Sequence, residues 1–163
     1  MIRPTLENDV ERLVQMARGT GVFRDLELLI LREGLDVMFD GLDQPCQLAI
    51  CYELDGRVAG FASYGQADMT DRSWYLFWII VDRLQQSRGI GSALLRHVEE
   101  EVRAKEGRIL LIETSSLPMY DATRGFYKKH GYEQVATIPD YYADEDDLCV
   151  FRRRLNAHGG APS

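Results

Sequence analysis

The sequence predicts an α/β fold in which helices cover both faces of a mixed sheet. Two strand-forming stretches flank Asp55-Gly56, a strong hairpin signal because glycine supplies the positive φ of a type I′ turn. Further along, an apolar strand, a glycine-rich turn, a helix and a second apolar strand follow one another. That unit is long enough for a parallel crossover. A sheet with both kinds of pairing needs helices to bury its faces.

The N-terminal part is predicted as a short strand followed by two helices. Residues 2–5 form the strand, and residues 6–18 carry apolar side chains at helical spacing. Gly19 and Gly21 then interrupt the pattern. A second helix is predicted over residues 23–39, although its interior glycine weakens the helical signal.

The middle of the chain is predicted as three strands. Residues 47–54 and 57–64 are the two arms of the hairpin. Residues 74–81 form a nearly continuous apolar and aromatic run, and this pattern is typical of a strand covered on both faces.

A helix over residues 92–106 is predicted after the glycine-rich turn. Its charged residues, Glu99 among them, fall mostly away from the apolar stripe and are expected on the outside. Gly107 is the expected stop. Apolar residues four apart share the face that should be buried: Ile90, Leu94, Val98 and Val102.

The remaining elements are a strand over residues 109–112, a short helix over 120–130 that Gly131 ends, and two closing strands over 132–138 and 148–155. Turn residues at the ends of short strands and a glycine at the end of a helix are the boundary signals expected in an α/β chain.

Between the closing strands lies an acidic run at residues 140–147, which we interpret as a solvated loop or as a rim that attracts a cationic substrate. The length of 163 residues suits one domain, predicted over residues 1–156. Residues 157–163 are predicted to be a flexible C-terminal tail.

Composition excludes several classes of protein. The net charge of −7 disfavours nucleic acid as a partner and favours cationic substrates such as amines. No apolar run approaches the roughly 20 residues that cross a membrane, and the first residues lack a signal peptide's apolar stretch, so a cytoplasmic protein is expected. The three cysteines form no CxxC pair, which argues against a disulfide framework and a metal site.

The most informative segment is the glycine-rich turn between the apolar strand and the central helix. Amides at a helix start carry partial positive charge, and glycines let a phosphate approach the backbone closely. Arg88 adds a positive charge. The turn therefore predicts an anion site suited to a pyrophosphate, formed by Gln86, Ser87, Arg88, Gly89, Ile90, Gly91 and Ser92.

Other phosphate-binding motifs fit less well. A P-loop would need Gly-x-x-x-x-Gly-Lys-Ser/Thr, which is absent. A dinucleotide fingerprint needs Gly or Ala where the chain has Leu94, although Glu113 lies about where the ribose-binding acid would be. The unit also sits mid-chain, after an antiparallel hairpin. A nucleotide-binding oxidoreductase stays open as an alternative.

Two separated motifs resemble the GNAT N-acetyltransferase superfamily. Gln86-x-x-Gly89-x-Gly91 resembles the family's Gln/Arg-x-x-Gly-x-Gly/Ala signature, and residues 126–132 (FYKKHGY) resemble its later helix end. The order of elements over residues 2–155 also fits. The resemblance implies the GNAT acyl-CoA N-acyltransferase fold: an α/β (α+β) arrangement with a mixed, mostly antiparallel sheet, a central parallel strand–helix–strand unit and about four helices.

The resemblance also implies acetyl-CoA as the co-substrate, with no metal. The turn would hold its pyrophosphate, and the end of the preceding strand would pair with pantetheine, with a backbone amide near Ile79 facing the thioester oxygen. Relatives often carry an asparagine where this chain has Tyr120. The remaining cofactor contacts implied by the resemblance are Ile79, Ile80, Val81, Tyr120 and Thr123.

For catalysis, the resemblance points to Tyr127 as general acid, because a phenol with a pKa of about 10 can protonate a thiolate of about 8.5. Many relatives place a glutamate on the long strand, where this chain has Tyr75. Glu113, at the carboxyl end of the next strand, is the best replacement as general base. A water chain to bulk solvent is the alternative.

The resulting hypothesis is an N-acetyltransferase that transfers acetyl from acetyl-CoA to a primary amine of a small, cationic acceptor by direct attack. A small molecule or a peptide can supply that amine, and no nucleic acid or membrane partner is expected. A homodimer stays open. The alternative is a non-catalytic acyl-CoA-binding sensor or interaction domain, which the missing strand glutamate motivates.

Overall fold

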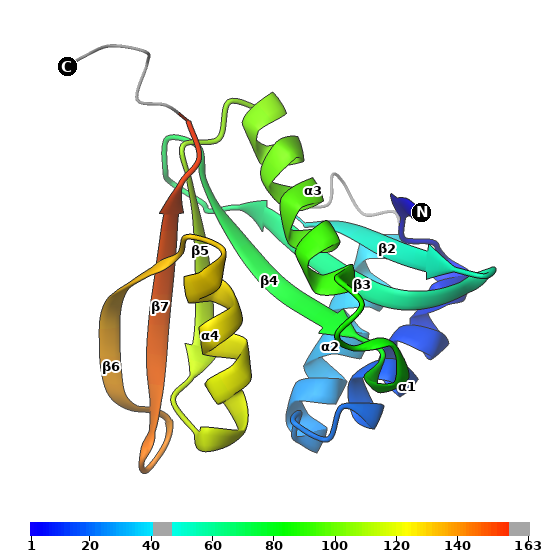
Figure 1. The fold of residues 1–163 in the computed structure, drawn as a ribbon, viewed down its shortest axis with the longest axis horizontal. Helices are drawn as coiled ribbons and strands as arrows, with labels where there is room; N and C mark the ends of the chain where they lie inside the picture. The colour runs from blue at the N-terminus through cyan, green and yellow to red at the C-terminus, as the bar shows by residue number, and fades with distance from the viewer. Residues whose placement is uncertain (41–46, 157–163) are drawn as a thin grey trace. The chain divides into compact units, whose positions relative to one another are not determined.

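The structure, a computed structural model, describes residues 1–40 and 47–156. The predicted tail at residues 157–163 lies outside the described residues. In chain order the elements are β1 (Ile2–Pro4), η1 (Glu7–Asp9), α1 (Val10–Gly19), α2 (Asp25–Phe39), β2 (Leu48–Leu54), β3 (Arg57–Gln66), β4 (Ser73–Val81), η2 (Arg83–Gln85), α3 (Ile90–Ala104), β5 (Ile109–Ser115), η3 (Pro118–Tyr120), α4 (Asp121–Lys129), β6 (Glu133–Ala143) and β7 (Asp146–Arg154) (Figure 1).

The strands form one sheet in the order β1-β2-β3-β4-β5-β7-β6. Strands β4 and β5 pair in parallel, with Ser73 opposite Ile109 and Leu76 opposite Ile112, and α3 connects them. The β1–β2, β2–β3, β5–β7 and β6–β7 pairs are antiparallel. The described residues contain four α-helices. The predicted mixed, mostly antiparallel sheet with a central parallel strand–helix–strand unit is therefore confirmed.

The predicted hairpin turn is also confirmed. Leu54 pairs with Arg57, and both residues between them have positive φ, 51° at Asp55 and 75° at Gly56, as a type I′ turn requires. Beyond the turn the register shifts, so that Ala59 is the extra residue of a β-bulge.

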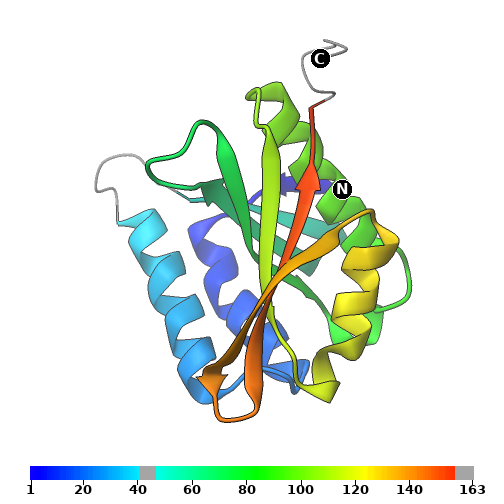
Figure 2. The same ribbon diagram turned by 90° about the vertical axis from the view of Figure 1, so that its left-hand side faces the viewer.

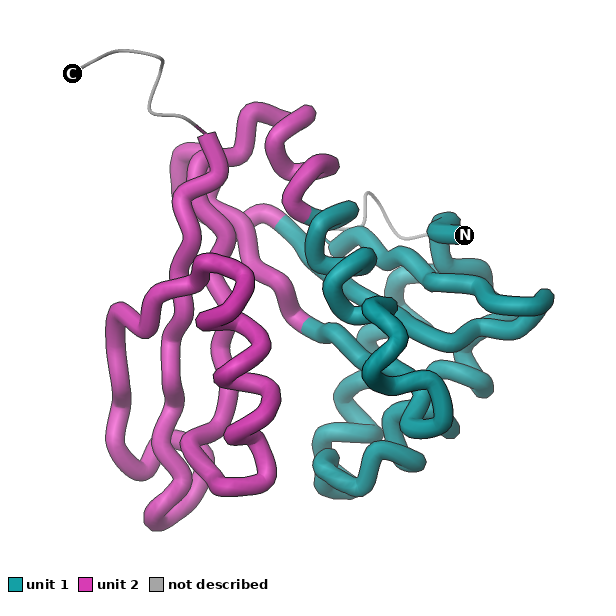
Figure 3. The backbone as a smooth tube through the Cα atoms, in the orientation of Figure 1, with its two compact units in different colours: residues 1–65, 78–98 teal, residues 66–77, 99–163 magenta. Residues whose placement is uncertain are grey.

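The chain forms two compact units, coloured separately in Figure 3. Unit 1 comprises residues 1–65 and 78–98, and unit 2 comprises residues 66–77 and 99–163. The boundary falls inside β4 and inside α3, so both units contain parts of the same two elements. The prediction of a single domain over residues 1–156 stays a prediction.

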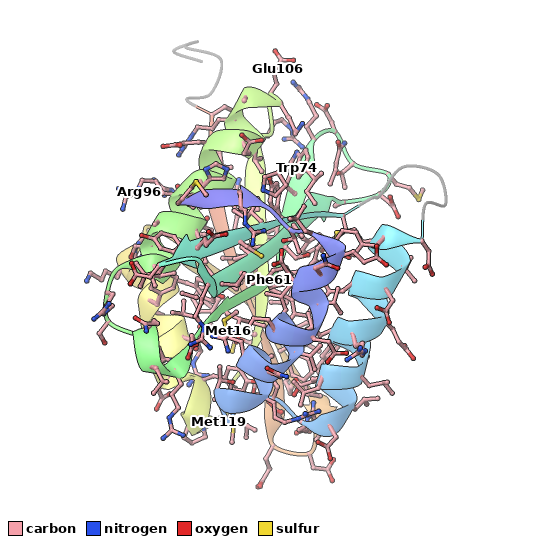
Figure 4. All side chains as sticks on the ribbon, turned by 90° about the vertical axis from the view of Figure 1, so that its right-hand side faces the viewer. Met16, Phe61, Trp74, Arg96, Glu106 and Met119 are labelled. Carbon is pink, nitrogen blue, oxygen red and sulfur yellow. The ribbon has the colours of Figure 1, made fainter. Side chains whose placement is uncertain are left out.

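The core of unit 1 lies between two helices and one face of its strands. Helices α1 and α2 run side by side (Figures 1 and 2) and carry apolar side chains four apart toward β2 and β3. Met16 and Phe61, labelled in Figure 4, belong to this core. Its members are Val10, Leu13, Met16, Ala17, Leu28, Leu31, Leu35, Cys51, Val58, Phe61 and Ile80.

The opposite face of β3 receives the first half of α3. Successive strand residues point to opposite faces, so Gly60 lies on the face away from Phe61. A Cβ atom at Gly60 would lie 2.7 Å from Ile90 Cγ2 and 2.9 Å from Leu94 Cδ1. Glycine is therefore required here for close packing of the helix on the strand. The predicted buried stripe of α3 is confirmed, since Ile90, Leu94, Val98 and Val102 are all buried.

In unit 2, α4 packs on the β5–β7 pair through Tyr127, whose ring centroid lies 5.8 Å from that of Phe151. The end of α3 was predicted at Gly107 for its backbone freedom, and this reason is wrong. The helix ends at Ala104, Glu106 takes the positive φ of 60°, and a Cβ at Gly107 would lie 2.2 Å from Val102 Cγ1. Gly107 is required for close packing.

Three other predictions are wrong in detail. Helix α3 begins at Ile90, two residues earlier than predicted, because Gly89 already serves as its N-cap. Phe77 is 46% exposed, so β4 is not covered on both faces along its whole length. The acidic run is not a loop, because β6 continues to Ala143 and β7 begins at Asp146. The buried Asp146 accepts a hydrogen bond from the Ser115 hydroxyl, and this tertiary contact satisfies one of its carboxylate oxygens.

Among the helices of the described residues, none combines the length and the apolar character that crossing a bilayer requires. Nor do residues 1–40 and 47–156 hold a group of three His, Cys, Asp or Glu side chains arranged to hold a metal ion.

Candidate functional site

The turn before α3 is fixed at its start by Asp82, which directly follows β4. Its carboxylate accepts a hydrogen bond from the Leu84 amide at 3.0 Å and an ion-paired hydrogen bond from Arg12 of α1. Arg12 also donates to the Val58 carbonyl of β3 at 3.1 Å. Partial burial opposes ionisation of Asp82, but the Leu84 amide and Arg12 outweigh it and lower the pKa of the carboxyl group. The turn is thus tied to both α1 and β3.

The turn itself contains two residues in the left-handed region, Ser87 with φ of 66° and Gly89 with φ of 78°. Glycine adopts this conformation without strain, whereas an L-residue such as serine does not. No atom lies within 4 Å of a Cβ built at Gly89, so glycine is needed there for its backbone conformation. Residues 86–89 are all exposed. The backbone of the turn is therefore open to a ligand.

The first helical hydrogen bond of α3 runs from the Ala93 amide to the Gly89 carbonyl at 3.0 Å. Helix geometry consequently offers no intrahelical acceptor to the amides of Ile90 and Gly91. These amides stand at the positive end of the helix dipole, and Arg88 is exposed beside them. Residues 86–92, predicted as a phosphate site, therefore lie together with the chemistry that an anion requires.

Residues 79–81 form the end of β4 in unit 1, as predicted. The Ile80 side chain is 2% exposed and belongs to the apolar core, so Ile80 can contact a cofactor only through its backbone. Ile79 and Val81 are partly exposed, and alternation along the strand places them on the other face.

Tyr127 lies on α4 in unit 2 and is 4% exposed. Its ring packs edge-on against Phe126 and Tyr132, with centroids 5.6 and 6.1 Å away. Burial raises the pKa of this phenol well above its ordinary value. Within residues 1–40 and 47–156 its hydroxyl forms no hydrogen bond. Tyr127 is therefore a buried phenol that stays neutral at physiological pH.

Tyr132, which packs against Tyr127, is held by a buried charge network that the sequence did not predict. The Tyr132 amide donates to the Tyr127 carbonyl at 3.0 Å, and the Tyr132 hydroxyl donates to Glu99 at 2.9 Å. Arg153 donates to both oxygens of Glu99, at 2.9 and 2.8 Å. Burial, reinforced by the negative charge of Glu99, raises the pKa of Tyr132. The network orients the ring that Tyr127 packs against.

Glu99 is 4% exposed, so the prediction that it lies outside the buried face is wrong. It lies one helical turn after Leu95, which is also buried, and this widens the stripe beyond the four apolar residues. The spacing of four residues between Leu95 and Glu99 was the only feature of the sequence that could have indicated that Glu99 is buried. The partners that make burial tolerable come from β7 and from the end of α4.

Glu113 is exposed on β5 and forms no ion pair within the part of the chain that the structure describes. Tyr75, on the parallel neighbour β4, is partly buried. Burial and then the charge of Glu113 raise the pKa of Tyr75. The residue at the place of the family's strand glutamate is thus a neutral phenol near a carboxylate on the adjacent strand.

Tyr120 is the N-cap residue of α4, and Thr123 lies one turn further; both are partly exposed. Arg124 donates to the carbonyls of Ser115 and Leu117, which holds the connection between β5 and α4. Of the predicted site residues, 79–81 and 86–92 therefore belong to unit 1, whereas Glu113, Tyr120, Thr123 and Tyr127 belong to unit 2.

A family model for the acetyltransferase (GNAT) domain matches residues 46–134, more than half of the chain. The chain belongs to the GNAT family. Members of this family transfer an acetyl group and use acetyl-CoA, so acyl transfer is the general activity of this GNAT protein.

Individual relatives agree with this assignment. An uncharacterized N-acetyltransferase of Methanocaldococcus jannaschii is 29% identical over 111 residues, which cover 66% of this chain and 67% of the relative. The crystal structure of a protein assigned to the GNAT acetyltransferases of Desulfovibrio desulfuricans matches with a TM-score of 0.91 and 29% identity, covering 96% of this chain and 99% of that one.

An aminoglycoside 6'-N-acetyltransferase complexed with coenzyme A has the same fold, with a TM-score of 0.76 and 18% identity over 97% of this chain and 98% of that one. The GNAT fold of this chain therefore rests on both the family model and the structural matches.

Proposed function

We propose that this GNAT protein transfers an acetyl group from acetyl-CoA to a primary amine by direct attack of the amine on the thioester. The observation that carries the proposal is the exposed stretch at residues 86–89, whose left-handed residues Ser87 and Gly89 lead into the amides of Ile90 and Gly91, for which the helix offers no acceptor. A turn of this kind binds the diphosphate of a nucleotide through the backbone. Coenzyme A supplies a diphosphate.

Arg88 contributes a positive charge at the same place. Its side chain is exposed on the turn and no ion pair of Arg88 occurs within the described residues, so its guanidinium is available to a phosphate oxygen. Charge-assisted hydrogen bonds to phosphate are stronger than neutral ones. The proposed cradle thus combines the amides of the first helical turn with one arginine.

The reaction requires an amine without its extra proton. An ammonium group first loses a proton, and the neutral nitrogen then attacks the carbonyl carbon of the thioester. The carbonyl oxygen becomes an oxyanion, which a backbone amide near Ile79 would stabilise. When the tetrahedral intermediate collapses, the carbon–sulfur bond breaks and the thiolate takes a proton. The nitrogen loses its second proton, which leaves an amide, CoA and one proton in solution.

We assign the protonation of the thiolate to Tyr127. Its phenol is neutral because burial raises its pKa, and a general acid must carry its proton until the leaving group needs it. We assign the removal of the ammonium proton to Glu113, whose exposed carboxylate has access to solvent. Tyr120 and Thr123 are proposed as further contacts to the cofactor.

The cysteines support direct attack over a covalent acetyl-enzyme. Burial raises the pKa of the Cys51 thiol to about 11, so almost none of it is thiolate at neutral pH. Cys149 is also buried. Cys46 lies outside the described residues. A thiol without thiolate character is a poor nucleophile, and the acetyl group is therefore proposed to pass to the amine in one step.

Calorimetric titration with CoA tests the cradle. Wild-type protein should bind CoA much more tightly than pantetheine, which lacks the diphosphate. Arg88→Ala should weaken CoA binding about tenfold and leave pantetheine binding unchanged, because one charge-assisted contact is lost. Arg83→Ala, also exposed and on the neighbouring η2, is the matched control and should bind as wild type. Absence of CoA binding would refute the proposal.

Turnover is tested by following free thiol release from acetyl-CoA with a panel of primary amines. Tyr127→Phe should lower kcat by about 10² or more while leaving CoA affinity unchanged, because only the proton is removed. If wild-type protein binds acetyl-CoA tightly but acetylates no amine in the panel, the protein is an acyl-CoA-binding sensor and the catalytic proposal fails.

A further inference from the structure

Two aromatic rings, the exposed Phe77 and the partly buried Tyr75, lie next to one another on β4 in unit 2. Tyr75 and Phe77 are two residues apart and therefore point to the same face of the strand. Their ring centroids are 5.9 Å apart and their planes meet at only 21°, so the two rings stack against one another as one aromatic pair. Phe77 is 46% exposed. A large aromatic side chain left open to this extent, next to a second ring, can bind a flat ligand group.

The pair has a carboxylate beside it. Parallel pairing places Tyr75 opposite Leu111 and ends with Leu76 opposite Ile112, and Glu113 lies two residues after Leu111 on the same face of β5. Strands β4 and β5 are neighbours in Figure 1. Residues opposite one another in a pair point to the same face, which puts Glu113 on the face of the two rings. The effect of the Glu113 charge on Tyr75 agrees with this placement.

The positive charges of the neighbouring strand do not neutralise Glu113. Across β5, its partner on β7 is the uncharged Val150, and Arg152 lies opposite Leu111, two residues along the same face. No ion pair joins Arg152 or any other cation of the described residues to Glu113. The carboxylate therefore keeps its charge available for a ligand.

We propose that Tyr75, Phe77 and Glu113 form the acceptor site and select a primary ammonium carried on an aromatic or other flat apolar group. The inference rests on the proposed function and names the chemical class of the amine that accepts the acetyl group. The ammonium pairs with the Glu113 carboxylate, and the apolar group packs against the Tyr75–Phe77 pair. Small hydrophilic amines, which can use only the carboxylate, bind less well.

The test is equilibrium binding of amines, measured by NMR titration of the protein without acetyl-CoA. Three probes separate the two features of the site: 2-phenylethylamine carries both a ring and an ammonium, ethanolamine lacks the ring, and 2-phenylethanol lacks the charge. Wild-type protein should bind 2-phenylethylamine about tenfold more tightly than either of the other two. Equal affinity for 2-phenylethylamine and ethanolamine overturns the inference.

Variants assign the effect to the proposed residues. Phe77→Ala should weaken the binding of 2-phenylethylamine about fivefold to tenfold and leave the binding of ethanolamine unchanged. Glu113→Gln should make 2-phenylethylamine bind no better than 2-phenylethanol. Ile138→Ala is the matched control, since Ile138 is 47% exposed on β6 of the same unit, and it should change neither. If Phe77→Ala binds like wild type, the aromatic pair is not the site.

The outcomes distinguish the inference from the proposed function. Selective amine binding without any acetyl transfer contradicts the proposed function and leaves the amine site standing. Acetyl transfer to hydrophilic and aromatic amines with equal kcat/KM, together with unselective binding, leaves the proposed function standing and refutes the amine class.

Discussion

In the first half of α3, Ile90 and Leu94 lie against Gly60 of β3, whereas the second half begins with Glu99, whose carboxylate is almost completely buried. The first half is buried through close packing of apolar side chains. Its side chains fit only because residue 60 has no side chain, and no charge takes part. The second half also buries a charge, because the Glu99 carboxylate is held by Arg153 and Tyr132.

The two kinds of burial fail in different ways. A well-packed apolar contact loses stability in proportion to the misfit, and its neighbours can relax by a few tenths of an ångström. A buried carboxylate whose partners are removed leaves an uncompensated charge, which is far more costly. We therefore expect the second half of α3 to be more sensitive to single changes than the first.

The largest effect is expected at Glu99. Glu99→Ala should lower the free energy of unfolding by about 3 kcal/mol, because it leaves the Arg153 guanidinium and the Tyr132 hydroxyl without their shared partner. Urea denaturation measures the change.

Glu100→Ala is the control for Glu99, since the neighbouring residue is exposed and should shift stability by no more than about 0.5 kcal/mol. Equal destabilisation by the two variants would show that the network does not stabilise unit 2, and the contrast between the halves of α3 would disappear.

An intermediate effect is expected at Gly60. Gly60→Ala should destabilise the protein by about 1–3 kcal/mol, because its Cβ would lie 2.7 Å from Ile90 Cγ2 and would displace the start of α3. CoA affinity should fall in the same variant, since residue 90 contributes one of the amides of the cradle. Thermal denaturation and calorimetry measure the two effects.

Gly34→Ala serves as the matched glycine for Gly60. It lies inside α2 with no atom within 4 Å of its Cβ position, so alanine should stabilise the helix by about 0.5–1 kcal/mol. If Gly60→Ala were as well tolerated as Gly34→Ala, close packing at Gly60 would not determine the stability of the first half of α3.

The smallest effect is expected at Asp9. This ion-paired carboxylate is less buried than Glu99 and so extends the comparison to a more accessible charge. Arg3 donates to both of its oxygens, at 2.8 and 3.0 Å, and this bond lowers the pKa of Asp9 below its ordinary value of 3.8. The folded state therefore binds this proton less readily than the unfolded state. The stability it contributes is present above about pH 4 and is lost as the pH falls through the lower, folded pKa.

Asp9→Asn should accordingly be less stable than wild type by about 1 kcal/mol at pH 7, and the difference should shrink as the pH falls below 4. Thermal melting across this range measures it, with the exposed Glu7→Gln as control. A difference that stays constant from pH 7 to pH 2 would contradict the role of the Asp9 charge.

The fold could be predicted where local pattern decides structure. The turn at Asp55-Gly56, the apolar stripe of α3 and the glycine-rich turn depend on residues close together in the chain, and each was predicted correctly. The phosphate-binding prediction for residues 86–92 uses backbone amides, which glycine spacing reveals directly. The structure places these residues as predicted, and their function stays a prediction until CoA is titrated.

Prediction failed where distant residues decide. Glu99 has a local ion-pair contact with Arg103 at 3.7 Å, but its hydrogen-bond partners Tyr132 and Arg153 lie 33 and 54 residues away, where no local pattern identifies them. Asp146 is buried inside the acidic run because the Ser115 hydroxyl, 31 residues earlier, bonds to it. A charged residue is predicted to be solvated unless its hydrogen-bond or ion-pair partners are known, so sequence patterns do not reveal buried polar networks.

Ser87 holds a left-handed backbone conformation that costs an L-residue about 1–2 kcal/mol, and the folded chain bears this cost before any ligand arrives. If the turn binds the proposed diphosphate, the ligand meets a backbone that is already bent, because folding has supplied the conformational energy. Affinity at this place is then limited by contacts and not by rearrangement. A Ser87→Gly chain would relieve the strain and in exchange let the turn sample shapes that no diphosphate fits.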